Sequence, residues 1–317
     1  MRPSSTTSLV VGHLIGRRIR SRSVASRSTG ICDRRFRRRL TQVVRTRADL
    51  RSALGALPRS IGLVPTMGWL HEGHRALMQQ ARAADATTVV TIFVNPRQFD
   101  VASDFSRYPR NEARDIGVCE SEGIDLVFAP EPPEIYPPGF DTMVSVGALA
   151  KPLEGAARPG HFDGVATVVA ILFDLIAADH AYFGQKDAQQ VMVIRQMARD
   201  LAIGTEVIAC PTVREPDGLA LSSRNVHLSL AERSAAPVIH RALLAARGRW
   251  EAGEQSAEAL RRVMREALAS EPLAVADYVS VADARTLAEL ERIDAPALIS
   301  MAASFGSTRL IDNELVG

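Results

Sequence analysis

The sequence has 317 residues, a length that suits one large domain or two ordinary ones. Its net charge of +2 is unevenly placed, because residues 1–40 hold eleven arginines and one acid, Asp33, whereas residues 41–317 hold 27 basic and 35 acidic residues. No apolar run reaches the ~20 residues of a membrane span. Three cysteines without a Cys-x-x-Cys pair indicate a reducing compartment, so the sequence predicts a cytoplasmic protein.

Residues 1–40 are set apart by their composition and admit three interpretations. An Arg- and Ser-rich, acid-poor segment is typical of an organelle transit peptide. A basic arm is also able to contact nucleic acid. The simplest interpretation, which we favour, is a disordered N-terminal extension. A secretory signal is excluded, because the apolar stretch at residues 9–16 is barely long enough and no small-residue cleavage site follows it.

From residue 41 onward, short apolar strands alternate with amphipathic helices. Thr46 and Asp49 stand at capping-box spacing, which predicts a helix over residues 46–54. The β-branched run at residues 87–96 is typical of a buried strand. By the same criteria we expect strands at residues 61–66, 124–130, 180–184 and 205–213, helices at residues 72–84, 109–122, 163–178 and 187–201, and a Pro-rich loop at residues 131–140. This alternation predicts a Rossmann-like doubly wound domain over residues 41–212, a parallel sheet with helices on both faces.

The pattern changes after residue 212. Asp217-Gly218 predicts a turn inside a hairpin. We expect helices at residues 229–252 and 255–270, and strands at residues 275–281, 297–303 and 308–312. The sequence therefore predicts an α/β chain in which a smaller α/β domain, residues 213–317, follows the larger one.

Polar clusters stand where several of the predicted strands end. They are "PTMGWLHEGH" (65–74), "NPRQF" (95–99), "FGQKDAQQ" (183–190) and, at the junction of the two domains, "ALSSRN" (220–225). Ligands of an open parallel sheet bind at the carboxyl ends of its strands. We therefore expect these four clusters to form one site.

The first cluster contains His71 and His74, with Gly73 between them. A zinc site is disfavoured, because zinc proteases place two histidines four residues apart on one helical face, and no third ligand with convincing spacing follows. The two side chains could also do no more than cap a helix. Phosphate binding is the stronger interpretation, since a helix start offers free N–H groups and Gly73 allows a ligand to approach the backbone. The imidazoles could donate hydrogen bonds, and add positive charge, as a phosphorus transition state forms.

The tetrapeptide His71-Glu72-Gly73-His74 matches the His-x-Gly-His signature of the nucleotidylyltransferase superfamily. Longer strings follow in order along the chain: "VPTMGWLHEGH", "FVNPRQF", "YPR", "EIYPPG", "LEGAARPGHFDGVATVV", "FGQKDAQQ", "DGLALSSRN" and "RLIDN". With these strings the sequence resembles the pantoate–β-alanine ligase family from about residue 42 to its C-terminus. The resemblance leaves residues 1–40 uncovered.

The resemblance implies synthesis of pantothenate, a coenzyme A precursor, in two steps. Pantoate would attack the α-phosphorus of ATP to give pantoyl adenylate and pyrophosphate, and the amine of β-alanine would then displace AMP. Adenylation needs the triphosphate charge to be neutralised, with Mg²⁺ bridging its oxygens. The metal's direct ligands stay unassigned, although Asp187 could help to position it. The resemblance also implies a homodimer, which the residues themselves do not indicate.

By resemblance, the ATP-binding positions are Met67, Gly68, Trp69, Leu70, His71, Glu72, Gly73, His74, Gly184, Gln185, Lys186, Asp187, Val213, Leu221, Ser222, Ser223 and Arg224. The candidate catalytic residues among them are His74, His71, Lys186, Ser222, Ser223 and Arg224. The histidines would stabilise the transition state, with His74 at the family's proton-donor position. The lysine, serines and arginine carry the charge and donors that a triphosphate and its pyrophosphate leaving group need.

Two glutamines complete the predicted site. Gln98 and Gln190 match the family's pantoate-binding amides, with Gln98 also near β-alanine, and an amide suits this task because it both donates and accepts hydrogen bonds. Four further residues resemble positions that line the site, although a purely structural role is also open for each: Asn95, Tyr108, Arg158 and His161.

Three positions depart from the family pattern. Gln185 stands where the family usually has Glu, and Arg97 and Leu221 stand where Met is common. Gln185 would remove a charge beside the triphosphate, and Arg97 would add one next to Gln98. Neither removes a group that the mechanism needs, but both could change substrate affinity from the family norm, so full activity does not follow from the resemblance.

Two other functions remain open at the level of sequence. Another member of the superfamily, such as a cytidylyltransferase, would share the His-x-Gly-His loop but should lack the paired glutamines Gln98 and Gln190. An RNA-binding protein that uses the basic arm would need basic and aromatic residues across its body. The body is acidic and the chain is only 5% aromatic, which disfavours that function.

Overall fold

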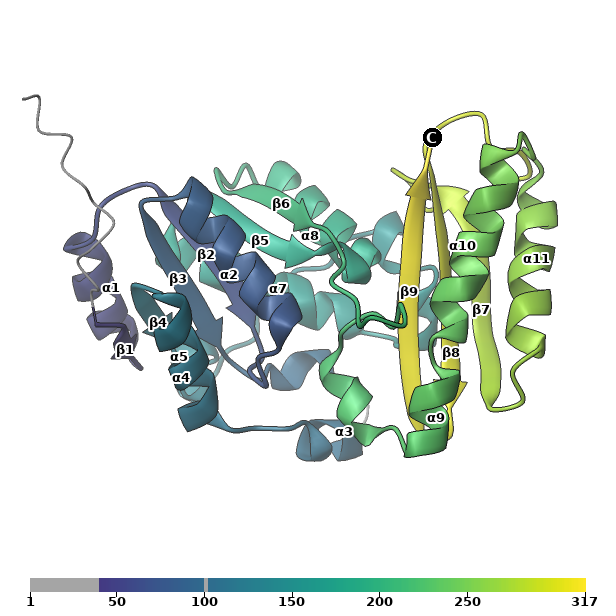
Figure 1. Ribbon diagram of the computed structural model, residues 1–317. Coiled ribbons are helices and arrows are strands. Elements are labelled where there is room, and N and C mark those ends of the chain that lie inside the picture. The colour runs from purple at the N-terminus through teal and green to yellow at the C-terminus, as the bar shows by residue number, and fades with distance from the viewer. Residues whose placement is uncertain (1–39, 100–101) are drawn as a thin grey trace, which may run out of the picture. The chain divides into compact units, whose positions relative to one another are not determined.

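The computed structural model describes residues 40–99 and 102–317 (Figure 1). The expectations for residues 1–39, including the three interpretations of the basic tail and the state of Cys32, lie outside these ranges. Within them, no helix is long and apolar enough to cross a membrane.

Six parallel strands form the larger sheet, in the order β1-β4-β3-β2-β5-β6. The strands are β1 (Gln42–Val44), β2 (Ile61–Thr66), β3 (Thr87–Ile92), β4 (Leu126–Phe128), β5 (His180–Gly184) and β6 (Glu206–Cys210). The predicted parallel sheet is confirmed. Strand β1 was not expected, because three residues are too few to show a period.

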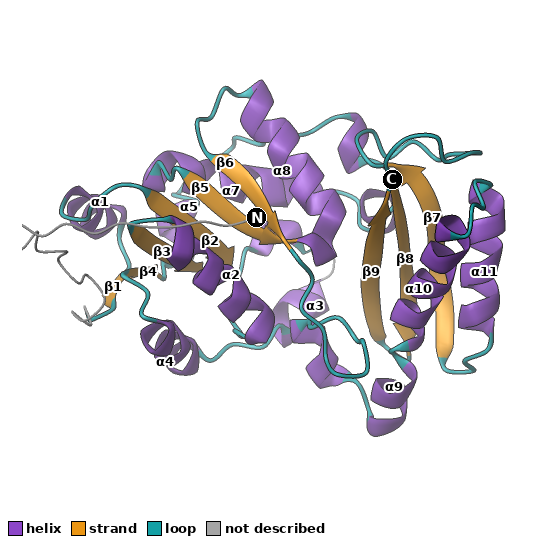
Figure 2. Cartoon of the chain, turned by 45° about the horizontal axis from the view of Figure 1, so that its top comes forward, coloured by secondary structure: helices purple, strands orange, loops and turns teal. Residues whose placement is uncertain are grey.

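Helices cover both faces of this sheet (Figures 1 and 2). One face packs against α1 (Arg47–Gly55), α7 (His161–Ile176) and α8 (Ala188–Asp200), and the other against α2 (Glu72–Ala84) and α4 (Glu112–Glu122). Neighbouring residues of one strand alternate between the two cores: Leu63 lies in the first and Val64 in the second. A strand that is buried on both sides is mostly apolar, which explains the nearly continuous apolar runs of the sequence.

Short helices lie in several segments where no helix was expected. They are η2 (Pro96–Gln98), α3 (Ala102–Arg107), α5 (Pro132–Ile135), η3 (Ala148–Ala150), α6 (Glu154–Ala157), η4 (Gln185–Asp187) and η5 (Ser223–His227). The expected strand at residues 87–96 was too long, because Asn95 caps η2 by accepting a hydrogen bond from the N–H of Arg97. The expected Pro-rich loop contains α5, since proline is well tolerated in the first turn of a helix.

A smaller antiparallel sheet follows, in the order β7-β8-β9, with strands β7 (Ala274–Asp283), β8 (Ala297–Phe305) and β9 (Thr308–Val316). Figure 2 shows α10 (Val238–Glu251) and α11 (Ala257–Ala269) beside it. The single helix expected at residues 229–252 was wrong: α9 (Leu230–Ala235) and α10 are separated at Pro237, which lacks an N–H donor. The predicted turn is present, with Gly218 at φ 96° and one antiparallel bridge between Arg214 and Ala220.

Candidate active site

A cavity of about 240 Å³ opens at the carboxyl ends of β2 and β5. These strands are neighbours in the sheet, and the chain winds away from β2 toward both edges. Such a switch point is where open α/β sheets bind ligands. All four predicted polar clusters reach this cavity. The lining includes Met67, His71, Gly73, His74, Asn95, Gln98, Tyr108, Arg158, His161, Gly184, Lys186, Asp187, Gln190, Val213, Leu221, Ser222, Ser223 and Arg224.

His71 and His74 cap the start of α2 with their own side chains. The N–H of Gly73 donates to Nδ1 of His71 at 3.1 Å, and the N–H of His71 donates to Nδ1 of His74 at 3.2 Å. Because both Nδ1 atoms accept, each neutral ring carries its proton on Nε2. Both rings also line the cavity. The capping and ligand-binding interpretations are therefore compatible, with Nδ1 serving the helix and Nε2–H left as a donor.

The surroundings of the pair disfavour its protonation. Burial and then the charge of Lys186 lower the pKa of His71 to about 4. Burial, followed by the neighbouring His71 and Lys186, lowers the pKa of His74 to about 3. The protein groups thus keep both imidazoles neutral at pH 7. Two basic side chains, Lys186 and Arg224, line the same cavity.

A buried carboxylate holds the turn between β2 and α2. Asp115 is 1% exposed, and it accepts hydrogen bonds from the N–H groups of Trp69 at 2.7 Å and Leu70 at 2.8 Å. Gly68 has φ 80°, and a Cβ there would lie 2.9 Å from Asp115 Oδ2. Glycine is therefore required at this position both for its backbone angle and for its lack of a side chain. Sequence analysis missed Asp115, since nothing local marks a carboxylate that serves a distant turn.

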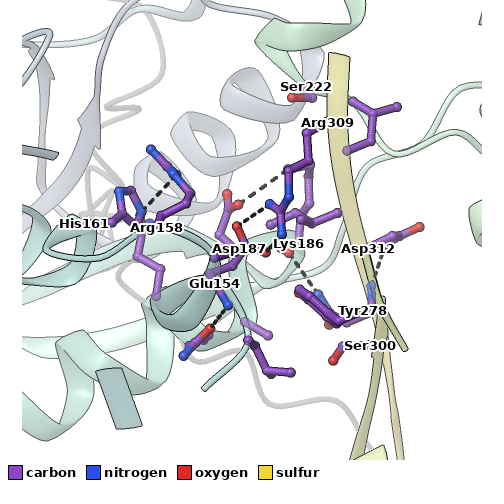
Figure 3. A pocket seen from close by; sticks show the side chains of 18 of the residues that line it. Glu154, Arg158, His161, Lys186, Asp187, Ser222, Tyr278, Ser300, Arg309 and Asp312 are labelled. Carbon is purple, nitrogen blue, oxygen red and sulfur yellow. Dashed lines mark hydrogen bonds and ion pairs between the residues drawn. The ribbon is translucent and has the colours of Figure 1, made fainter. Parts of the chain in front are cut away.

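Lys186 and Asp187 enter the cavity from η4, the single turn between β5 and α8. The Lys186 side chain is 14% exposed, and its Nζ lies 3.4 Å from Asp187 Oδ1. A second cavity of about 200 Å³ adjoins the first, and both residues line it as well. Figure 3 shows Lys186 and Asp187 from this side, close to Glu154 and Arg309. One turn thus presents a cation and a carboxylate to both spaces.

Ser222, Ser223 and Arg224 line the cavity at the start of η5. Ser222 caps this turn by accepting a hydrogen bond from the N–H of Arg224 at 3.3 Å. Ser223 is hydrogen-bonded to the hydroxyl of Tyr108, whose pKa is raised mainly by burial. The predicted serine–arginine cluster therefore faces the histidines across one space.

Gln98 is buried, and its orientation is set by Asn95 and Tyr136. Asn95 Nδ2 donates to Gln98 Oε1 at 3.0 Å and to the carbonyl of Gly164 at 3.0 Å. The hydroxyl of Tyr136 donates to Asn95 Oδ1 at 2.7 Å. This chain of hydrogen bonds leaves the Nε2 donors of Gln98 for a ligand. Gln190 lines the same cavity from α8.

Arg158 and His161 hold the backbone of Gln98. His161 Nδ1 donates to the carbonyl of Gln98 at 2.8 Å, and Arg158 Nη2 donates to the same oxygen at 3.2 Å. Arg158 Nη1 donates to His161 Nε2 at 3.3 Å, which that nitrogen accepts only when unprotonated. Burial and then Arg158 lower the pKa of His161 to about 4. Both residues thus have a structural contact as well as a position at the cavity.

Several predicted ATP-binding residues contribute no lining to this cavity: Gly68, Trp69, Leu70, Glu72 and Gln185. Leu70 is buried in the core, and Glu72 is exposed and paired with Arg75. Gln185 donates from Nε2 to Asn313 Oδ1 at 3.2 Å. Sequence analysis expected Gln185 to remove a charge beside the triphosphate. In the structure this side chain is bonded to β9 and does not line the cavity.

Sequence analysis also expected Arg97 to add a positive charge next to Gln98, and the geometry gives this little support. Its guanidinium lies over the rings of Tyr136, at 4.8 Å, and Phe140, at 4.7 Å. It does not belong to the lining of the cavity that holds Gln98. Stacking on two rings is a sufficient account of an arginine at this position.

The described residues offer few metal ligands. Within residues 40–99 and 102–317, no group of three His, Cys, Asp or Glu side chains is placed to hold a metal ion. Asp187 is the one carboxylate among the described residues that line the cavity. This donor set suits a Mg²⁺ ion that is held mainly by phosphate oxygens and water, and it does not suit a zinc centre.

Comparison with known proteins is consistent across the sequence and the fold. A chain from Roseiflexus castenholzii named pantothenate synthetase is 56% identical over 272 residues, which cover 86% of this chain and 98% of that protein. One from Chloroflexus aggregans is 57% identical, covering 87% and 99%. The crystal structure of pantothenate synthetase from Thermus thermophilus matches with a TM-score of 0.83 at 48% identity, covering 86% of this chain and 98% of that one.

A further solved structure carries ligands in its description. It is a pantoate–β-alanine ligase from Francisella tularensis, complexed with β,γ ATP and β-alanine. It matches with a TM-score of 0.72 at 33% identity and covers 87% of this chain and 99% of that one. The family model for pantoate–β-alanine ligase matches residues 42–315. The chain therefore belongs to the pantoate–β-alanine ligase family.

Proposed function

We propose that this protein condenses pantoate with β-alanine to form pantothenate at the expense of ATP. In the first step a pantoate carboxylate oxygen attacks the α-phosphorus, the bond to the β-phosphate oxygen breaks, and pyrophosphate leaves. In the second step the β-alanine amine attacks the acyl carbon, loses a proton, and releases AMP. The observation that carries this proposal is a single cavity. It is lined by side chains suited to phosphate and by the paired glutamines: His71, His74, Lys186, Arg224, Gln98 and Gln190.

His71 and His74 act in this proposal as neutral hydrogen-bond donors to the phosphates. Their Nδ1 atoms are engaged with the backbone, so each ring offers one Nε2–H. A donor that is fixed before the substrate arrives costs no reorganisation as charge develops in the transition state. Their low pKa values support this role, because a neutral ring keeps both the cap and the donor.

Lys186 and Arg224 supply the positive charge for the triphosphate and for the pyrophosphate that leaves. They approach from two separate turns, η4 and η5, and both line the cavity. Ser222 and Ser223 add hydroxyl donors beside Arg224. A guanidinium and hydroxyls suit a leaving group with several phosphate oxygens, whereas the ammonium of Lys186 acts as a point charge.

Gln98 and Gln190 hold pantoate next to the phosphate groups. The network through Asn95 fixes the Gln98 amide, which presents Nε2–H to a carboxylate or hydroxyl oxygen. Holding the attacking oxygen close to phosphorus replaces a bimolecular encounter with a local step.

Mg²⁺ is part of the proposal as the partner of ATP. It would neutralise charge on the phosphate oxygens when bound. Asp187, the carboxylate of the cavity, would help to hold it, together with phosphate oxygens and water.

Three further properties are proposed with the function: a homodimer, a location in the cytoplasm, and a division into domains at residues 41–212 and 213–317. Membership of the family supports the first. The separate apolar cores of the two sheets support the third. Light scattering of the purified chain measures the oligomeric state directly.

The deciding experiment is pyrophosphate release from ATP and Mg²⁺ with and without pantoate, and then with β-alanine added. We expect release to require pantoate, to stop after about one equivalent per site while the adenylate stays bound, and to turn over when β-alanine is supplied. Pyrophosphate release that does not depend on pantoate would overturn the substrate assignment.

A further inference from the structure

The amide of Asn313, on β9, is bonded to the turn that carries Lys186. Its Nδ2 donates to the carbonyl oxygen of Gln185 at 3.0 Å and to that of Lys186 at 2.9 Å. Its Oδ1 accepts from Gln185 Nε2 at 3.2 Å. Asn313 is 6% exposed, so these hydrogen bonds are made in a buried environment.

The three bonds define the orientation of both amides. Backbone carbonyls only accept hydrogen bonds, so the nitrogen of Asn313 must face the turn and its oxygen must face Gln185. That oxygen in turn requires a donor from position 185, which Gln provides and ionised Glu does not. The glutamine that departs from the family pattern thus completes this contact.

The turn has little side-chain support of its own. Neither Gly184 at the start of η4 nor Asp187 at the start of α8 makes a side-chain capping bond. The Lys186 ammonium must nevertheless be held inside a cavity, and a long flexible side chain gains precision only from a fixed backbone. The amide on β9 is the group that bonds to this backbone on both sides of the Lys186 amide nitrogen.

A second residue on the same face of β9 reinforces the contact. Arg309 lies four positions before Asn313, so both side chains point to one side of the strand. It binds Glu154 at the start of α6, at 2.7 and 2.8 Å. The strand is therefore tied at two points to the segments that surround Lys186.

We propose that Asn313 is a positioning residue that holds η4 so that Lys186 reaches the triphosphate. The proposal rests on the ligase function given above and assigns that function a residue on the C-terminal strand. Asn313 itself is not required to touch substrate. Its effect should pass through Lys186, and this dependence is what distinguishes positioning from a general contribution to stability.

The test is a double-mutant cycle on Asn313→Ala and Lys186→Ala, read by pantoate-dependent pyrophosphate release. Displacement of a positioned group by about 1 Å can cost up to roughly 10²-fold, so we expect Asn313→Ala to lower kcat/KM for ATP by about 10- to 100-fold. In the Lys186→Ala background, Asn313→Ala should lower kcat/KM for ATP by less than about twofold, because the ammonium that Asn313 positions is no longer present.

Val316→Ala is the matched control. Val316 is a buried core residue on the same strand, and its truncation weakens the sheet without touching η4. We expect it to keep near-normal kcat/KM below its unfolding temperature. If Asn313→Ala does not fold, Asn313→Ser replaces it, since serine can still donate one hydrogen bond to the turn.

Affinity for a non-hydrolysable ATP analogue gives a second readout that does not depend on the identity of the acid. Asn313→Ala should weaken this affinity, and should not do so in the Lys186→Ala background. Equal effects of Asn313→Ala in both backgrounds, or wild-type kinetics in the single variant, would overturn the proposal. A wild-type chain that binds the analogue but shows no pantoate-dependent release would instead refute the ligase function alone.

Discussion

Glu154 and Arg309 are 155 residues apart in the chain and are joined by two hydrogen bonds, of 2.7 and 2.8 Å, between carboxylate and guanidinium (Figure 3). Glu154 is buried, and its partner also binds Asp277 at 2.6 Å. Burial alone would lower the pKa of Arg309, but these acidic partners raise it above its ordinary value. The pair thus connects α6 to the strand that carries Asn313.

Glu154→Gln should destabilise the protein by roughly 1.5–3 kcal/mol, the worth of a hydrogen bond to a charged group in a buried setting. Urea unfolding measures the change. Asp277→Asn is the matched control, because Asp277 is half exposed and a surface ion pair contributes only about 0–1 kcal/mol. A larger loss for Asp277→Asn than for Glu154→Gln would contradict this ranking.

His74→Ala should slow adenylate formation by roughly 10²–10³-fold, the usual cost of one transition-state donor. The change also removes the cap at the start of α2, so a second variant is needed. Gln is the ordinary partner at this capping position, and His74→Gln should keep the cap while losing the imidazole. Single-turnover pyrophosphate release should show the full loss in His74→Ala and a smaller loss in His74→Gln, whose amide can cap through Oε1 and still donate from Nε2. Near-normal turnover in His74→Ala would refute the assignment.

The low pKa of His74 predicts how stability depends on pH. The pKa is about 3 in the folded protein, against 6.5 for an unperturbed histidine, so between these values only the unfolded state binds the proton. The stability that the neutral His74 gives the folded protein is intact above pH 6.5 and is lost progressively as the pH falls toward 3. His74→Gln should therefore reduce the slope of unfolding free energy against pH, near pH 5, by about 1.4 kcal/mol per pH unit.

His180→Gln is the control for that measurement. Its hydrogen bond to Asp85, at 2.7 Å, raises the pKa of His180. Below pH 6.5 this histidine is protonated in both states, so its removal should leave the slope near pH 5 unchanged. Parallel slopes for wild type and His74→Gln would show that His74 is not held neutral.

Gln98→Ala should raise the KM for pantoate by about 3- to 10-fold, the worth of one or two hydrogen bonds, and should change the KM for ATP less. The reason is that Asn95 engages the oxygen of the Gln98 amide and leaves its Nε2–H, which the proposed function assigns to pantoate. Gln79→Ala, an exposed change on α2, controls for the loss of an amide. Steady-state kinetics that show equal effects on both substrates would contradict the assignment.

The periodicity of apolar residues and the position of polar clusters at strand ends were enough to predict much of the fold and of the candidate site. The buried strands and the helices that cover them follow from continuous apolar runs and helical spacing. The Thr46 cap of α1 follows from local capping chemistry, and the structure confirms its bond from the N–H of Asp49. Because the carboxyl ends of parallel strands meet at one edge, the joint placement of the polar clusters was predictable as well.

The contacts that hold the site together were not predictable in the same way. Asp115 and Asn313 bond to backbone groups that are distant in the chain, and a backbone acceptor or donor leaves no trace in the sequence of its partner. Elements of only three or four residues, such as β1 and α5, are too short to show a period. The string "RLIDN" was noted in the sequence. The contact that its asparagine makes could not be predicted, because it depends on which side of β9 faces η4.

The hydrogen bonds from Asn313 to η4 also determine the order in which parts of the chain can fold during synthesis. A ribosome makes the histidine cap and the Lys186 turn early, and it makes β9 only after both. β9 pairs with β8, so the small sheet must be assembled before the amide of Asn313 can reach the turn. A nascent chain can therefore complete its parallel sheet before Asn313 reaches η4, and we expect full activity only after β9 has paired with β8.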